Sequence, residues 1–189
     1  MLWSFYYAIS LCFYVQIAAY IQVLWISIED NEEVLYNGAV EAILTLLGAC
    51  FALLAGKIHM NFLRKRNRML LTLITMSCLQ GVFVLLAATS QSLMMCYVFY
   101  ISYGVAYAFG ITICATEIAK NLADDTFGLI FGFNTLIALT VQTIITLSVV
   151  SSGFKMSPRG QFQVYGGFYI FLGFGYLLNL LMGLFRSRD

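Results

Sequence analysis

Glu41 is the residue of this sequence with the clearest capacity for chemistry. It is the only formally charged residue well inside an apolar run long enough to cross a lipid bilayer. A charge near the centre of a membrane-spanning helix costs about 2.5 to 3.5 kcal/mol on insertion scales, so it rarely lies there without a partner. A carboxylate there predicts binding of a cationic group or exchange of a proton. The alternative is a carboxylate near the outer interface, because Glu41 follows Tyr36 closely.

The other residue types that commonly carry chemistry form no recognisable site. The five cysteines lie in separate apolar runs, and the single histidine, His59, lies in a basic loop. A metal centre or a disulfide framework needs clustered ligands, so we expect neither a metal nor a cofactor. No hydrolase triad, metalloprotease motif or phosphate-binding loop is present, and no basic patch with interleaved aromatics suggests nucleic acid. The sequence therefore predicts a protein that is not an enzyme.

Composition sets the class of protein. Of 189 residues, 61% are hydrophobic and 10% are charged, and the mean hydropathy is +0.88. Soluble domains carry about 25% charged residues. We therefore expect an all-α polytopic protein embedded in a lipid bilayer.

Six apolar runs reach the length of about 20 residues that a bilayer-spanning helix needs. They cover residues 2–27, 36–56, 69–89, 94–116, 127–150 and 163–185. The only proline, Pro158, falls between the last two runs, so no proline-kinked span is expected. The sequence predicts a single six-helix transmembrane domain over residues 1–189.

The basic residues predict the orientation of these helices. Eight of the ten Lys and Arg residues fall in the loops after the second and fourth runs or in the C-terminal tail, against Lys155 and Arg159 on the opposite side. Because basic residues accumulate on the cytoplasmic side, both termini are expected to be cytoplasmic. The sequence is compatible with the plasma membrane and with an organelle membrane. We expect the plasma membrane.

Polar and small residues recur at helical spacing within several runs. On the second run they are Asn37, Glu41, Thr45, Gly48 and Ala52, and on the fifth they are Asn134, Ala138, Gln142 and Thr146. Helix packing in membranes also uses small and polar residues. We therefore expect packing roles for Gly48, Gly166 and Gly173, whereas Asn134 and Gln142 are open to either packing or ligand binding.

Five stretches of the sequence are specific in combination: Tyr-Asn-Gly-Ala-Val-Glu-Ala (36–42), Thr-Leu-Leu-Gly-Ala (45–49), Phe-Gly-Phe-Asn-Thr (131–135), Gln-Thr-Ile-Ile-Thr (142–146) and Gln-Phe-Gln-Val-Tyr-Gly (161–166). With these stretches the chain resembles the reduced folate and thiamine transporter family of solute carriers, within the major facilitator superfamily. The resemblance covers nearly the whole chain but only the C-terminal half of the family, its spans seven to twelve. It implies one half of a transporter with a substrate held between two halves. The missing partner would be an N-terminal half or a second copy.

The resemblance also implies roles for individual residues. Glu41 matches a position that is glutamate in thiamine members and aspartate in folate carriers, and Gln142 matches a glutamine of thiamine members where folate carriers have lysine. Tyr107 matches a tyrosine of the tenth family helix. Two positions depart from the pattern: Ala19 stands where thiamine members have asparagine, and Gly104 where members usually have arginine or lysine.

Charge favours one vitamin substrate over the other. Folate is a dianion that needs fixed positive charge, and no basic residue lies inside any run. Thiamine is a cation that a carboxylate and tyrosine rings can hold. We therefore expect uptake of thiamine or a related organic cation by alternating access, with folate transport and a non-transporting packing or interaction role as alternatives. The substrate-binding candidates are Glu41, Tyr107, Asn134, Gln142, Tyr20 and Tyr103.

Overall fold

The computed structural model describes residues 2–29, 36–57, 66–120, 122, 126–151 and 156–186. Its helices are α1 (Leu2–Ile26), α2 (Asn37–Gly56), α3 (Arg66–Thr89), α4 (Leu93–Ala119), α5 (Phe127–Ile145) with a π-helical continuation η4 (Thr146–Ser151), and α6 (Pro158–Arg186). Six of these segments are long and apolar enough to cross a membrane, the fifth being α5 together with most of η4. The predicted fold class is confirmed: the chain is an all-α membrane protein with the six helices of one half of a major facilitator fold.

Several helices extend beyond the apolar runs that predict them. Helix α6 begins at Pro158 rather than at residue 163, because a proline at the first helical position gives up only an N–H that would have no partner there. Helix α3 begins at Arg66 rather than at residue 69. Long basic side chains at a helix end can reach the interface while the backbone stays helical.

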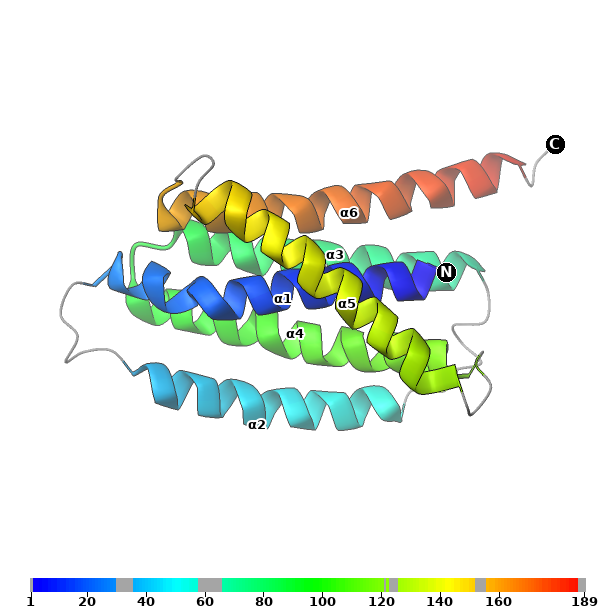
Figure 1. The fold of residues 1–189 in the computed structure, drawn as a ribbon, viewed down its shortest axis with the longest axis horizontal. Helices are drawn as coiled ribbons and strands as arrows, with labels where there is room; N and C mark the ends of the chain where they lie inside the picture. Colours follow the sequence, from blue (N-terminus) through cyan, green and yellow to red (C-terminus); the bar gives the residue numbers. More distant parts are fainter. Residues whose placement is uncertain are drawn as a thin grey trace.

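Two helices occupy the middle of the bundle. Helix α4 packs against α1, α2 and α3, and α1 packs against α4, α5 and α6. Figure 1 shows α2 along one edge of the molecule and α5 crossing α1 diagonally. In α5 only Asn134 and Ala138 are buried. Helices α2 and α5 therefore each leave a large part of their surface without a partner among the described helices.

The most extensive helix pair joins α3 to α6, which lie side by side in Figure 1. Glycines set how closely they approach. A Cβ atom at Gly166 would lie 2.7 Å from Leu85 Cγ and 3.1 Å from the carbonyl oxygen of Gly81, and one at Gly173 would lie 2.9 Å from Cys78 Sγ. This packing agrees with the role predicted for Gly166 and Gly173, whereas at Gly48 the nearest atom, Ala108 Cβ, is at an ordinary 3.5 Å.

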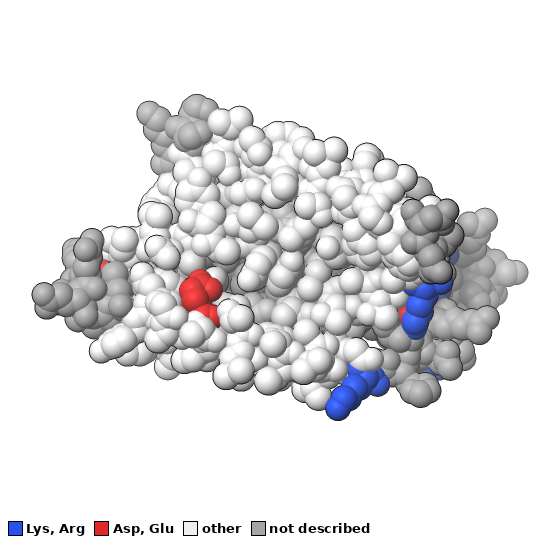
Figure 2. Space-filling view, turned by 60° about the horizontal axis from the view of Figure 1, so that its bottom comes forward, with Lys and Arg blue, Asp and Glu red and all other residues white. Residues whose placement is uncertain are grey.

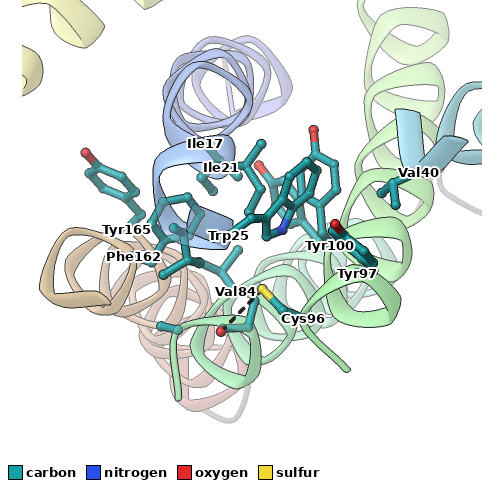
Figure 3. Packing of buried hydrophobic residues seen from close by; sticks show 14 of the residues in the cluster. Ile17, Ile21, Trp25, Val40, Val84, Cys96, Tyr97, Tyr100, Phe162 and Tyr165 are labelled. Carbon is teal, nitrogen blue, oxygen red and sulfur yellow. Dashed lines mark hydrogen bonds between the residues drawn. The ribbon is translucent and has the colours of Figure 1, made fainter. Parts of the chain in front are cut away.

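The core forms two clusters of buried side chains, one toward each end of the bundle. The larger contains Trp25, Tyr97, Tyr100 and Tyr165, and the smaller contains Trp3 and Tyr6 with side chains of α3, α4 and α6. Figure 3 shows the larger cluster, in which the Cys96 thiol also lies 3.7 Å from the Ala87 carbonyl oxygen. The larger cluster is the one that reaches the start of α2, where Glu41 lies.

Candidate functional site

Glu41 lies in the second turn of α2 and is half-buried. Its carboxylate oxygen Oε1 accepts a hydrogen bond of 2.9 Å from the Tyr100 hydroxyl of α4. The only ion pair among the described residues joins Lys120 to Glu117, so no described basic side chain pairs with Glu41. The Thr45 hydroxyl, one turn further along α2, bonds to the Glu41 backbone carbonyl at 2.8 Å. The acid predicted from the sequence is therefore held by a neutral phenol.

A groove opens next to Glu41 between α1, α2 and α4. It has a volume of about 340 Å³, and its lining includes Tyr14, Thr45, Gly48, Tyr107 and Thr112. The Tyr14 and Tyr107 rings are stacked with centroids 3.9 Å apart and an interplanar angle of 5°. Glu41 is not among the lining residues, but it lies one helical turn before Thr45 on α2. The groove thus has an aromatic wall with a carboxylate nearby.

Two larger grooves, of about 530 and 480 Å³, lie elsewhere on the molecule. Apolar side chains line almost all of both, and neither lining includes any of the six substrate-binding candidates. Within a membrane, lipid chains are the expected occupants of apolar grooves of this kind. The smaller groove beside Glu41 is therefore the better candidate for a polar ligand.

Gly104 lies in the floor of this groove, where the resemblance leads one to expect a basic residue. A Cβ atom at Gly104 would lie 2.6 Å from Leu44 Cδ1 and 2.8 Å from Leu44 Cγ. The Leu44 side chain, itself buried, fills the space that a larger side chain would need. Because α2 packs in this way, position 104 makes an apolar contact between helices where the resemblance leads one to expect a positive charge.

In the described part of the chain, none of the remaining candidates forms a hydrogen bond with the Glu41 carboxylate. The Tyr103 side chain is 1% exposed, and its hydroxyl shares a hydrogen bond of 3.1 Å with Tyr169 of α6. Asn134 is buried on α5, and its amide Nδ2 has no hydrogen-bond partner among the described residues. Gln142 and Tyr20 are half-buried. The structure thus places Tyr107 in the groove and holds Tyr103 in a contact between helices.

A second polar contact lies at the end of α5. The hydroxyl of Thr146, the first residue of η4, donates a hydrogen bond of 2.9 Å to Gln16 Oε1, and the Gln16 amide donates one of 2.9 Å to the Tyr165 hydroxyl. This network joins α1, η4 and α6. Thr146, which belongs to the polar stripe of the fifth apolar run, therefore takes part in packing between these helices.

Sequence reasoning missed Tyr100 and Tyr14, although signals for them exist. Tyr97, Tyr100, Tyr103 and Tyr107 follow one another at spacings of three, three and four residues, so α4 carries a continuous tyrosine stripe. Glu41 on α2 lies opposite the N-terminal end of that stripe on the neighbouring helix α4. Tyr14 has no comparable signal, because its importance comes from stacking on a residue of another helix.

The chain is similar to known transporters over most of its length. Residues 1–164 match the family model described as reduced folate carrier. Thiamine transporter 1 of Mus musculus is 34% identical over 187 residues, which are 98% of this chain and 37% of that protein. Folate-like transporter 3 of Caenorhabditis elegans is 34% identical over 98% of this chain and 42% of that protein.

Thiamine transporter 2 of Mus musculus is 35% identical over 94% of this chain and 36% of its own length. The chain thus spans about two-fifths of the relatives it matches, and it corresponds to their C-terminal half. These relatives are membrane transporters rather than enzymes. Because the family model matches most of the sequence and six helices can span a membrane, the chain belongs to the reduced folate carrier family.

Proposed function

We propose that this chain supplies one half of a vitamin transporter, and that its substrate is thiamine or a related organic cation carried by alternating access. The Glu41 carboxylate supports the choice of a cation, since its only described hydrogen-bond partner is the neutral Tyr100 hydroxyl. A cationic ring in the adjacent groove would meet the carboxylate and the Tyr14–Tyr107 pair together. Attraction between a cation and an aromatic face contributes about 0.5 to 2 kcal/mol.

Folate transport is the alternative within the same family. A dianion in a cavity of low dielectric constant needs basic partners. The described basic side chains, Lys57, Arg66, Arg68, Lys120 and Arg159, lie in the terminal turns of helices or directly after them. On the face that Figure 2 shows, the basic side chains gather at one end of the molecule, and no basic residue lines the groove between α1, α2 and α4. This half therefore fits a cation better than a dianion.

The charge distribution supports an orientation for the proposed transporter. Lys57 directly follows α2, Arg66 begins α3 and Lys120 directly follows α4. Figure 1 places these three helix ends at the end of the molecule where α1 begins and α6 ends. By the positive-inside rule, we assign this end to the cytoplasm, in the plasma membrane. A C-terminal epitope should then react with antibody only after cells are permeabilised.

A substitution at Glu41 tests the proposed substrate. We expect Glu41→Gln to weaken binding of labelled thiamine by tenfold or more, because the amide cannot neutralise the cation. Binding should be measured with the purified chain in lipid nanodiscs, against labelled folate as the competing substrate.

Glu117→Gln is the matched control, since Glu117 is a helix carboxylate that pairs with Lys120 at 3.2 Å. We expect this variant to bind thiamine within twofold of the wild type. Equal thiamine binding by Glu41→Gln and the wild type would contradict the role of the charge. Tighter binding of folate than of thiamine would favour the alternative substrate.

A further inference from the structure

The Glu41 carboxylate is held at one of its two oxygens. Oε1 accepts the Tyr100 hydroxyl at 2.9 Å, whereas Oε2 accepts no hydrogen bond from any described residue. A carboxylate side chain that protrudes from a helix has several rotamers of similar energy. Fixing one oxygen restricts these rotamers and leaves the other oxygen open to a ligand.

The phenol that holds Glu41 is itself tightly packed. The Tyr100 side chain is 2% exposed, and its ring meets the Trp25 indole edge to face, with centroids 5.4 Å apart at 84°. Trp25 is fully buried and makes a second edge-to-face contact with Tyr97, at 4.9 Å and 86°. Figure 3 shows Trp25 of α1 beside these two rings of α4. Such aromatic pairs add stability beyond the area they bury.

A second phenol of the same stripe holds the start of α2. The Tyr97 hydroxyl accepts a hydrogen bond of 3.2 Å from the backbone N–H of Tyr36, and lies 3.4 Å from Asn37 Oδ1, to which it can donate. Tyr97 and Tyr100 are one helical turn apart, as are Asn37 and Glu41. Two phenols of α4 therefore fix two successive turns of α2.

We propose that Tyr100 is the positioning residue for Glu41. Its ring packs against Trp25, and its hydroxyl orients the carboxylate so that Oε2 remains available to a cationic group at the groove beside Tyr14 and Tyr107. Tyr100 acts through Glu41 and does not line the groove itself. The cationic ligand rests on the proposed function, whereas the orientation of Glu41 does not.

Tyr100→Phe tests the orientation directly, since it removes only the hydroxyl and keeps the ring against Trp25. The readout is the rate at which a hydrophobic carbodiimide labels Glu41 in the purified chain in nanodiscs, followed by peptide mass spectrometry. We expect labelling to be several-fold faster in Tyr100→Phe, because the carboxyl group loses its only hydrogen bond from the described protein. An unchanged rate would overturn the proposal.

Tyr165→Phe is the matched control. It removes another phenol hydroxyl of the same core cluster, one that bonds to Gln16 at 2.9 Å and not to Glu41. Labelling of Glu41 in this variant should equal that of the wild type. Equal acceleration in both variants would show a general loosening of the bundle and would also overturn the proposal.

Thiamine binding gives the second readout. Hydrogen bonds to charged groups are strong enough that losing one costs about tenfold in an equilibrium constant. We expect Tyr100→Phe to raise the Kd for thiamine by about that factor, and Tyr165→Phe to leave it within twofold. If the wild-type chain binds no thiamine, the proposed substrate fails while the labelling experiment still decides the role of Tyr100. Faster labelling with unchanged thiamine affinity would restrict Tyr100 to a structural role and overturn its part in binding.

Discussion

At the scale of single residues, Tyr14 and Tyr107 form the closest aromatic pair in the described structure. Their parallel rings at 3.9 Å make one continuous wall of the groove. The Tyr107 side chain is 9% exposed and Tyr14 is half-buried. Tyr14 therefore presents more of its surface to a ligand, although the family resemblance points only to Tyr107.

Replacing Tyr14 tests whether its ring contributes to binding. We expect Tyr14→Leu to raise the Kd for thiamine by about 3- to 30-fold, since a cation–π contact is worth about 0.5 to 2 kcal/mol. Tyr14→Phe keeps the ring and should stay within threefold of the wild type. Both values come from titration with labelled thiamine in nanodiscs. Equal losses in the two variants would indicate that the hydroxyl, and not the ring face, matters.

The sequence could reveal Glu41 but not its partner. A lone acid in an apolar run is visible from residue types alone, because its insertion is costly wherever it packs. The Tyr100 contact depends on the level at which α4 packs against α2, and Leu44 over Gly104 helps to set this level. Such contacts between helices cannot be obtained from the spacing within each helix.

At the scale of helices, the α3–α6 pair offers the sharpest test of packing. Gly166 and Gly167 are neighbours on α6 with opposite surroundings. A Cβ atom at Gly166 would clash with Leu85 and approach the Gly81 carbonyl oxygen, whereas a Cβ atom at Gly167 would meet nothing within 4 Å. The two positions have the same helical backbone and differ only in what faces them.

We expect Gly166→Ala to lower the Tm and the yield of folded protein, because overpacking costs about 1 to 3 kcal/mol. Gly167→Ala should leave the Tm unchanged or raise it slightly, since alanine favours a helix over glycine. Thermal unfolding followed by size-exclusion chromatography in detergent would measure both. A Tm for Gly166→Ala equal to that of Gly167→Ala would contradict the close approach of α3 and α6.

The helices themselves were largely predictable, and their ends and irregularities were not. Six apolar runs predict six helices because each backbone polar group must bond within the bilayer. The apolar pattern did not show where α3 and α6 begin, because their first turns contain charged residues and a proline. The π-helical turn after Ile145 has no signal in the sequence, and the Thr146–Gln16 hydrogen bond that accompanies it joins residues of different helices.

At the scale of the whole molecule, α2 and α5 leave broad apolar surfaces uncovered. Leu46 and Leu53 of α2 are 67% and 72% exposed, and Leu129 and Leu136 of α5 are 75% and 61% exposed. Some of this surface faces lipid in any membrane protein. The polar residues of the same helices, including Glu41 of α2, suit a protein-lined cavity better than lipid.

We propose that a second six-helix unit covers this face, either an N-terminal half of the kind the longer relatives have or another copy of the chain. Native mass spectrometry of the purified chain distinguishes the two, since a second copy doubles the mass. If the chain is a monomer, co-expression with the N-terminal half of a thiamine transporter should yield a complex and raise thiamine uptake. A monomer that forms no such complex would contradict the proposal.

The close approach of α3 and α6 also has a consequence for synthesis. Gly81 and Gly166 lie close together across this pair, but two membrane segments, α4 and α5 with η4, separate them along the chain. During synthesis, α3 enters the membrane long before α6 has been made. In that interval the face of α3 that carries Gly81 lies among lipids without its main partner. The α3–α6 pair is therefore completed only when α6 has left the ribosome, and a nascent chain that stops before α6 exposes this face to membrane quality control.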